Sequence, residues 1–432
     1  MTAVAAPTAR RRFRMGHLQT IGIVLGVLGL ALVGYVAPNA TTDDRTFGFE
    51  PPPEPLAVTF PAATAIAAIG VVYLLTAGVA LFERGGERYT RWALGVSGVL
   101  FFPLVVIVAL ALSDSTSTNV TQLLVESLSL GTPIALGAMA GLWCERSGVV
   151  NIGIEGMMLG SAGVGFMVYA TAGDANSDVW LWASILIAVL TGGAIAALHA
   201  LMSVTFRVDQ IISGVVINLL ALGVTGFLRS EVIVPSGVTS GITTQAFGLP
   251  LLSEIPILGP QLFTARPIFF SMFLVVLVTW WVIFRTPFGL RVRSVGEHPS
   301  AAETVGIDVI RTRYLAVIIG GLIAGLGGAW FSMESQGGFQ DNMTNGAGFI
   351  ALAALIFGKW RPWTAFGGAM LFGFTRALGS RLQILGVEVG DFEIPSELWQ
   401  SLPFVVTIVV VAGLIGRAIP PAAVGKPFQR SR

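Results

Sequence analysis

Long apolar stretches alternate with short polar breaks along most of the chain, which has 432 residues. About 20 apolar residues in a helix cross the ~30 Å hydrocarbon core of a bilayer, so stretches of this length predict membrane spans. One stretch, 346–358, is too short for a straight crossing, and we expect either a half-helix there or a helix extended from its outer end. The pattern predicts twelve helices, at residues 18–37, 58–82, 92–112, 121–142, 152–172, 179–206, 209–229, 267–285, 313–333, 346–358, 363–380 and 398–416.

The composition excludes a water-soluble globular protein. Hydrophobic residues make up 54% of the chain and charged residues 11%, whereas a soluble domain carries about 25% charged residues. Apolar and polar residues do not alternate regularly, so helices rather than a β-barrel are the expected spanning form. The net charge of +1 gives no sign of a nucleic-acid partner. The predicted fold class is an all-α polytopic membrane protein with about 12 transmembrane helices, one of them short.

The first apolar stretch has two interpretations. Arginines at positions 10, 11, 12 and 14 precede the stretch 18–37, which small residues near Ala37 follow. A signal peptide has this order of a basic region, an apolar region and a small-residue cleavage site. The apolar stretch is longer than the 7–15 residues of a typical signal peptide, so a retained first span is favoured.

Basic residues are distributed unevenly over the polar breaks. With a cytoplasmic N-terminus, 20 of the 25 Lys and Arg residues fall on the inner side of the membrane and five on the outer side. Loops that stay in the cytoplasm carry such an excess of Lys and Arg. We therefore expect an even number of spans and two cytoplasmic termini. The outer segments hold many of the acidic residues, namely Asp43, Asp44, Asp174, Asp178, Glu334, Asp341, Asp391 and Glu393.

Two connections are long enough to have structure of their own. The outer one, 230–266, has several Pro and Gly residues among short apolar pieces, which predicts an ordered cap. The inner one, 286–312, is basic, and its Ser300 and Glu303 have the spacing of a capping box at a helix start. Gly306 is the expected left-handed residue that ends this helix. A helix this short is marginal alone, so we expect it to pack against other elements.

The most informative segment is 145–160, where polar residues and four glycines interrupt the passage between two apolar helices. One interpretation is a broken helix that lines a solute path, with Asn151 and Glu155 inside the protein. The other is a turn in which Glu155 stabilises the first turn of the next helix. The sequence leaves both open. Asn218, Asn345 and His199 are further polar residues within spans, and they face either a cavity or a neighbouring helix.

Recognisable enzyme motifs are missing from the sequence. Neither of the two Gly-Lys pairs belongs to a Walker A motif, and there is no nucleophile elbow or zinc-protease motif. The single cysteine, Cys144, and three scattered histidines do not suggest a metal site. We predict no catalytic residues and no metal site. A membrane enzyme with Glu155 or His199 as acid or base stays an alternative.

Three segments together resemble the permease subunits of bacterial ABC importers for nucleosides, within a group that includes simple-sugar and branched-chain amino-acid permeases. The first segment reads ERSGVVNIGIEGMML at 145–159, the second FGLRVRSVGEHPSAAETVGID at 288–308, and the third GAGFIALAALIFGKWRP at 346–362. The resemblance covers about residues 119–418. It divides the chain into an N-terminal extension with three spans at 1–118, a permease core at 119–418 and a cytoplasmic basic tail at 419–432.

The resemblance implies the ABC importer permease fold and a place in the bacterial plasma membrane. The expected partners are an ABC ATPase with tandem domains, a second homologous permease and an extracellular substrate-binding lipoprotein. ATP and Mg are expected on the ATPase, and no cofactor on this chain. The segment that contacts the ATPase is expected to comprise Glu297, His298, Pro299, Ser300, Ala301, Ala302, Glu303 and Gly306.

The candidate substrate path comprises Asn151, Glu155, Asn218, Asn345 and Phe349. The expected function is ATP-driven import of a nucleoside along an interface with the second permease. The alternatives are a simple-sugar ABC permease and an ion-coupled secondary transporter, which also uses broken helices at the middle of the membrane.

Overall fold

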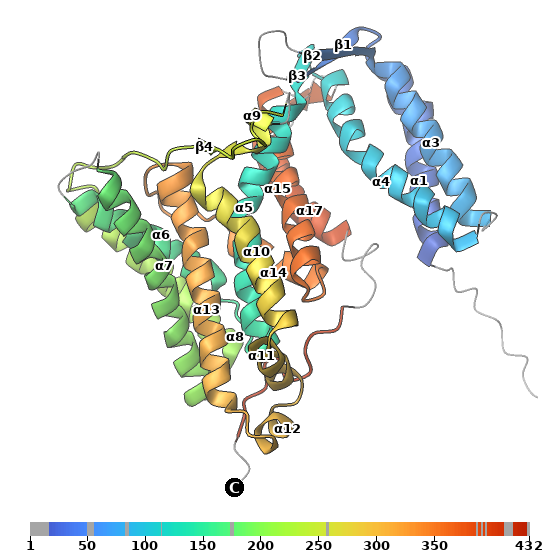
Figure 1. The fold of residues 1–432 in the computed structure, drawn as a ribbon. Coiled ribbons are helices and arrows are strands. Elements are labelled where there is room, and N and C mark those ends of the chain that lie inside the picture. The colour runs from blue at the N-terminus through green and yellow to red at the C-terminus, as the bar shows by residue number, and fades with distance from the viewer. Residues whose placement is uncertain are drawn as a thin grey trace, which may run out of the picture. The chain divides into compact units, whose positions relative to one another are not determined.

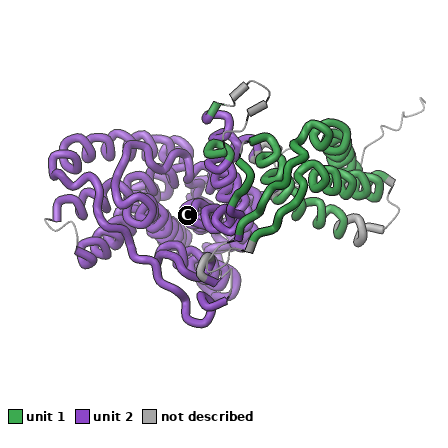
Figure 2. Tube along the Cα trace, turned by 90° about the horizontal axis from the view of Figure 1, so that it is seen from above, with its two compact units in different colours: residues 1–48, 56–118, 382–395 green, residues 49–55, 119–381, 396–432 purple. Residues whose placement is uncertain are grey.

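The structure is a computed structural model that describes residues 17–49, 56–82, 86–113, 115–172, 177–255, 259–385, 388–389, 392–393, 395–409 and 418–429. The arginines near the N-terminus and part of the last expected span lie outside these residues. The described chain divides into two compact units (Figure 2). Unit 1 comprises residues 1–48, 56–118 and 382–395, and unit 2 comprises residues 49–55, 119–381 and 396–432.

Unit 1 is built from three long helices and short strands. Its helical elements are α1 (His17–Ala31), η1 (Leu32–Val36), α2 (Ala37–Asn39), α3 (Ala62–Phe82) and α4 (Gly86–Ala111). Its strands are β1 (Asp44–Phe49), β2 (Leu56–Pro61), β3 (Ser117–Asn119), β6 (Glu388–Val389) and β7 (Phe392–Glu393). The first three strands form one sheet in the order β2-β1-β3, and β6 pairs with β7 antiparallel.

The core of unit 1 lies between α1, α3 and α4. Leu32, Ile66, Tyr73, Leu104 and Ile107 belong to one buried apolar cluster. The expected second span was too long at its start, because 58–61 belong to strand β2 and α3 begins at Ala62. The apolar character of Leu56–Pro61 fits a strand as well as a helix, and apolar content alone does not distinguish them.

Unit 2 is a bundle of helices. Its first half contains α5 (Val120–Arg146), α6 (Ile154–Thr171), α7 (Asp178–Ala200), η2 (Leu201–Thr205), α8 (Gln210–Leu228) and η3 (Arg229–Ile233). The middle contains β4 (Phe247–Gly248), α9 (Gly259–Leu262), β5 (Thr264–Ala265), α10 (Pro267–Arg285), α11 (Pro287–Glu297) and α12 (Pro299–Thr304). The last part contains α13 (Val309–Ala329), η4 (Trp330–Ser335), α14 (Ala347–Phe357), α15 (Pro362–Leu385), α16 (Ser396–Gln400) and α17 (Leu402–Val409).

Glycines allow the helices of unit 2 to approach closely. A Cβ atom on Gly192 of α7 would lie 2.6 Å from the Cα atom of Gly325 on α13. A Cβ atom on Gly156 of α6 would lie 2.8 Å from the Cα atom of Asn218 on α8. Real Cβ atoms do not come this close to backbone, so only glycine permits these crossings.

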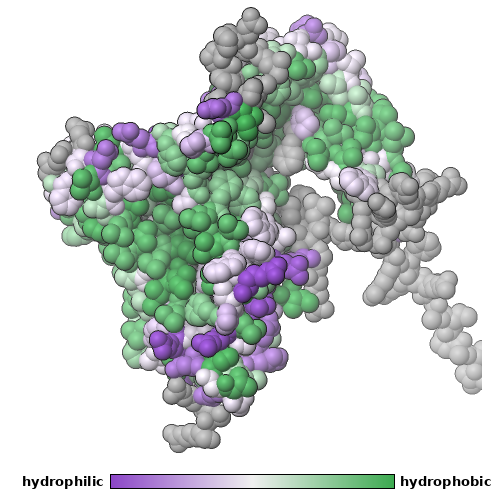
Figure 3. All heavy atoms as spheres, in the orientation of Figure 1, coloured by the Kyte–Doolittle hydropathy of each residue, from purple (hydrophilic) through white to green (hydrophobic). Residues whose placement is uncertain are grey.

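The two long connections lie at opposite ends of unit 2 (Figure 1). The loop that carries β4, α9 and β5 is at one end, called here the β4 end. The helices α11 and α12 are at the other end, called here the α12 end. Hydrophobic side chains cover the flank of the bundle between them, and hydrophilic side chains gather near α12 (Figure 3). This distribution is typical of a protein that crosses a bilayer.

Eight helices in the described part of the chain are long and apolar enough to cross a membrane. Each coincides with an expected span. The expected half-helix is α14, which has 11 residues. The other expected spans correspond to α6, to α15, and to α16 with α17. The eight are Gln19–Asn39, Ala62–Leu81, Trp92–Ala111, Val120–Arg146, Asp178–Thr205, Gln210–Ile233, Pro267–Arg285 and Val309–Ser335.

Candidate functional site

The expected break between two helices is present in unit 2. Helix α5 ends at Arg146 and α6 begins at Ile154, so residues 147–153 form a short connection, called here the broken segment. Gly148 has a φ of 89°, in the left-handed region that glycine adopts most easily. A Cβ atom there would lie 2.9 Å from the Nη2 atom of Arg313. The segment therefore packs tightly against α13.

Glu155, just after the broken segment, holds the start of another helix. Its Oε1 atom accepts hydrogen bonds from the Thr344 hydroxyl at 2.6 Å and the Gly346 amide at 2.9 Å. Its Oε2 atom accepts one from the Gly348 amide at 2.6 Å. Glu155 is 7% exposed. The carboxylate thus satisfies free amides at the start of α14, where a negative charge is also favoured by the helix dipole.

Asn218 and His199, on two other helices, form hydrogen bonds with the broken segment and the start of α6. The Asn218 side chain accepts a hydrogen bond from the Gly156 amide at 2.8 Å and donates one to the Ile152 carbonyl at 3.1 Å. His199 is fully buried, and its Nε2 atom lies 2.9 Å from the Val150 carbonyl. Because a carbonyl only accepts, Nε2 carries a proton in this contact. Helices α7 and α8 therefore fix the backbone between α5 and α6.

The other expected path residues occupy different surroundings. Asn151 is fully buried, its Nδ2 atom lies 3.3 Å from the Cys144 sulfur, and its Oδ1 atom has no hydrogen-bond partner among the described residues. Asn345 is exposed, and its carbonyl accepts a hydrogen bond from Arg376 at 3.1 Å. Phe349 is 47% exposed on α14. The structure thus brings Glu155 and Asn218 to the broken segment and places Asn345 and Phe349 at the exposed start of α14.

The three sequence segments that carry the family resemblance meet at the α12 end. Arg146 donates hydrogen bonds to the Trp360 carbonyl from Nε at 3.0 Å and from Nη2 at 2.7 Å. The Trp360 indole donates to the Glu145 carboxylate. The guanidinium of Arg146 also lies 4.0 Å from Glu297, the last residue of α11. This group, called here the motif junction, links the broken segment to the helices α11 and α12.

Helix α12 projects from the bundle at the motif junction. The structure corrects its expected start, because Pro299 begins the helix and His298, rather than Ser300, is the N-cap residue without a side-chain capping bond. Proline favours the first helical position, which shifts the helix start by two residues. The expected end is confirmed. Gly306 has a φ of 85°, its amide bonds to the Glu303 carbonyl, and the Ile307 amide bonds to the Ala302 carbonyl.

Residues of α12 divide into a buried face and an exposed face. Ala302 is buried in a cluster with Val295 and Val309, which confirms that the short helix packs against other elements. Ser300 and Ala301 are exposed, and Val305 is 75% exposed just after the helix. The helix therefore presents a small rigid projection with an apolar tip.

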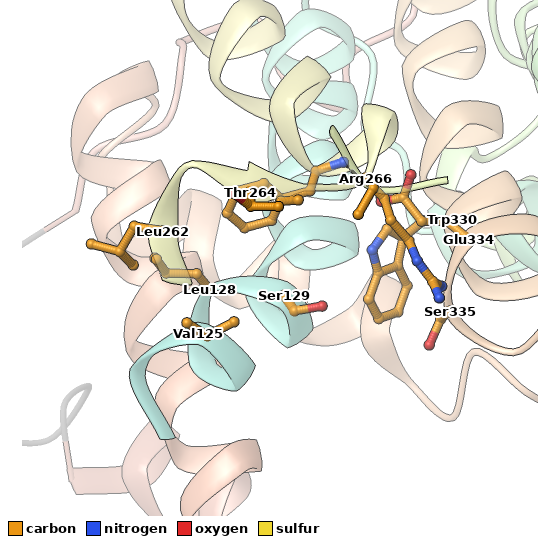
Figure 4. Close-up of a pocket in the computed structure, with 12 residues that line it drawn as sticks. Val125, Leu128, Ser129, Leu262, Thr264, Arg266, Trp330, Glu334 and Ser335 are labelled. Atoms are coloured by element: carbon orange, nitrogen blue, oxygen red, sulfur yellow. Dashed lines mark hydrogen bonds between the residues drawn. The ribbon is translucent and has the colours of Figure 1, made fainter. Parts of the chain in front are cut away.

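A cavity of about 300 Å³ lies at the β4 end, between α5, the loop before α10, and η4. Figure 4 shows apolar side chains of Val125, Leu128 and Leu262 at one end of it and polar side chains of Arg266 and Ser335 beside Trp330 at the other. Pockets with mostly apolar walls and a few polar groups are typical of small-molecule sites. The lining thus combines apolar side chains with a few hydrogen-bonding groups.

Comparison with known proteins identifies the family. The sequence profile of the branched-chain amino acid transport system permease components matches residues 123–411. The chain is a member of this permease family. It is 40% identical to the guanosine ABC transporter permease protein NupQ of Bacillus subtilis over 311 residues, which are 71% of this chain and 96% of NupQ. No solved structure shows a significant match to the chain.

Two further relatives show the range of the family. The chain is 37% identical to the nucleoside ABC transporter permease protein NupC of Lactococcus lactis over 317 residues, covering 73% of this chain and 99% of NupC. It is 36% identical to the putative glucose ABC transporter permease protein TsgC13 of Haloferax volcanii over 267 residues, covering 61% of this chain and 79% of TsgC13. The relatives are transport components, and the chain is a multi-pass protein of the bacterial plasma membrane.

Sequence analysis missed several residues of the permease core that the structure shows to be important. Glu334, expected as an outer acidic residue, is buried and accepts hydrogen bonds from the Ile268 amide at 2.7 Å and the Phe269 amide at 2.9 Å at the start of α10. Glu334 thus accepts hydrogen bonds from free amides at the start of α10, as Glu155 does at the start of α14. Helix α11 and the fully buried Arg313 were also missed. A signal was available for Arg313, since a charged residue at the edge of an apolar span usually has a partner.

Proposed function

We propose that this chain is the translocating subunit of an ATP-driven nucleoside importer. Its similarity to NupQ and NupC supports this substrate class. The observation that carries the proposal is the motif junction, because it connects an exposed projection to a broken helix through Arg146, Trp360 and Glu297. A force on α12 would reach the broken segment through these contacts. Interfaces and packed cores of this kind switch between discrete arrangements.

The proposed topology has twelve spans and two cytoplasmic termini. The α12 end then faces the cytoplasm and the β4 end faces outside. The excess of Lys and Arg on the proposed inner segments supports this orientation. The division into an extension at 1–118, a permease core at 119–418 and a basic tail at 419–432 stays a prediction.

The proposed partners follow from the two ends of unit 2. An ABC ATPase, with tandem domains that bind ATP and Mg, would contact α12 through the segment from Glu297 to Gly306. A substrate-binding lipoprotein would dock on the outer loop 230–266. A second, homologous permease would complete the translocation path. This chain would hold neither the nucleotide nor a metal ion.

The proposed solute path starts at the cavity of the β4 end. Trp330 offers an aromatic surface for the base, and Arg266 with Ser335 offers hydrogen bonds for the sugar. Further along, Asn345 and Phe349 are exposed at the start of α14 and would line the path. Glu155, Asn151 and Asn218 would shape the path from inside the protein, since their side chains are buried or half-buried.

Three other functions have weaker support. Similarity to TsgC13 keeps a simple-sugar permease as the second candidate. An ion-coupled transporter or an enzyme that uses Glu155 as an acid or base is less consistent with the structure. Both oxygens of the Glu155 carboxylate already accept hydrogen bonds from the protein, so the carboxylate is not free to bind an ion or to exchange a proton with a substrate.

The test uses right-side-out vesicles, loaded with ATP, from cells that express the whole transporter with its receptor and ATPase. ATP-driven uptake of labelled guanosine should be inhibited by excess unlabelled nucleoside and not by excess glucose. A proton or sodium ionophore should leave uptake unchanged, whereas inactivation of the ATPase should stop it. Glucose inhibition without nucleoside inhibition would favour the sugar permease, and loss of uptake with the ionophore alone would favour the ion-coupled transporter.

A further inference from the structure

The segment 421–428 near the C-terminus packs against the motif junction and is called here the strap. It lies at the α12 end of unit 2, where Figure 1 shows the described C-terminal trace. Its residues 422–425 form turns, with hydrogen bonds from Val424 to Pro421 and from Lys426 to Ala423. The basic tail is therefore folded against unit 2 at these residues.

Backbone amides of the strap donate hydrogen bonds to the end of α11 and to the broken segment. The Ala423 amide donates to the Gly296 carbonyl of α11 at 2.9 Å, and the Ala422 amide donates to Glu297 at 3.1 Å. Two residues further, the Gly425 amide donates to the Gly148 carbonyl of the broken segment at 3.3 Å. One turn of the strap therefore holds the end of α11 and the broken segment together.

Arg313 of α13 provides a third attachment. This side chain is fully buried, and its Nη1 atom donates to the Lys426 carbonyl at 3.0 Å. The Nε and Nη2 atoms of Arg313 have no hydrogen-bond partner among the described residues. A buried charged group that loses a partner is strongly unfavourable. The strap is therefore held by a buried cation as well as by main-chain contacts.

Phe428 anchors the far end of the strap beneath α12. It is 8% exposed and lies in one cluster with Val295 of α11, Ala302 of α12 and Val309 of α13. Ala302 is the buried residue of the projecting helix. The phenylalanine ring thus belongs to the apolar cluster that buries one face of the helix.

We propose that the strap is a brace for energy coupling, which makes α12 and the broken segment move as one body when the ATPase acts on α12. The proposal rests on the proposed function. Phe428 is then a positioning residue, because it touches neither solute nor nucleotide and acts through α12. Loss of the ring would let α12 move without the broken segment, so ATP would be hydrolysed without import.

The test measures solute imported per ATP hydrolysed by the whole transporter in proteoliposomes. Phe428→Ala should lower this ratio at least fivefold while the ATPase still copurifies and hydrolyses ATP. Phe428→Leu, which keeps an apolar side chain in the cluster, should restore most of the ratio. The matched control is Gln429→Ala, because Gln429 is exposed beside Phe428, and it should behave as the wild type.

Several results would overturn the brace. An unchanged ratio in Phe428→Ala would do so, as would equal loss of ATP hydrolysis and transport or loss of the ATPase from the complex. If Phe428→Ala does not accumulate, hydrogen exchange of the wild type decides. Backbone amides of the strap and of α12 should be equally protected from exchange, both with and without a nucleotide trapped in the ATPase. Loss of protection in the strap alone would contradict the proposal. A wild-type complex without ATP-driven uptake would instead refute the proposed function.

Discussion

Replacing Glu155 by Gln tests whether this carboxylate holds the start of α14. The carboxylate accepts three hydrogen bonds, from Thr344, Gly346 and Gly348. A glutamine of the same shape keeps one acceptor oxygen and turns an NH₂ group toward the remaining donor. In either orientation of the glutamine side chain, its NH₂ group faces a backbone amide, of Gly346 or of Gly348, that is itself a donor. At least one hydrogen bond is therefore lost.

The magnitude follows from the number and type of these bonds. A hydrogen bond to a charged group contributes roughly 1.5–3 kcal/mol, and the bonds that survive become weaker without the charge. The expected loss for Glu155→Gln is therefore about 2–4 kcal/mol of local stability. Since every 1.4 kcal/mol is a factor of ten, amides at the start of α14 should exchange with solvent about 30- to 700-fold faster.

The assay is hydrogen exchange of the purified protein in detergent, followed by mass spectrometry of peptides that cover 341–357. The control is Glu254→Gln, because Glu254 is exposed in the loop at the β4 end. That control should leave exchange in these peptides within about threefold of the wild type, as expected for a surface substitution. A Glu155→Gln protein with the same small change would refute the idea that Glu155 fastens α14.

Three further predictions test the packing of unit 2. Gly192→Leu should lower the free energy of unfolding by about 3 kcal/mol or prevent folding, since its Cβ atom would meet the backbone of α13. Gly223→Leu should be tolerated, because nothing lies within 4 Å of a Cβ atom at that position. Size-exclusion profiles after heating will compare the two variants. Glu334→Gln should speed amide exchange at the start of α10, by the same reasoning as for α14. Arg229→Ala should change the free energy of unfolding by less than about 1 kcal/mol, because its ion pair with Asp341 is exposed.

Sequence analysis predicted the helices of this chain well because membrane spans leave a strong signal. The apolar stretches correspond closely to the helices of both units. The end of α12 was also predictable, since Gly306 adopts a conformation that other residues avoid. Errors occurred where local chemistry was ambiguous, as at Leu56–Pro61 and at the start of α12.

The candidate site was predicted only in part, because its contacts join residues far apart in the chain. Segment 145–160 was recognised as unusual, but its sequence does not show that Glu155 reaches Gly346 or that Arg146 reaches Trp360. The position of Phe428 under α12 was equally hidden. Such pairings depend on tertiary packing, which the spacing of residues along a single chain does not encode.

The most direct test of the account asks which end of unit 2 contacts the ATPase. Val305 is 75% exposed beside α12 and Leu251 is 79% exposed in the loop at the β4 end, and the natural Cys144 is buried. Each position is changed to cysteine in the whole transporter and treated with a short thiol-reactive crosslinker. The account predicts that Val305→Cys crosslinks to the ATPase and Leu251→Cys does not. A crosslink from Leu251→Cys, with none from Val305→Cys, would contradict it.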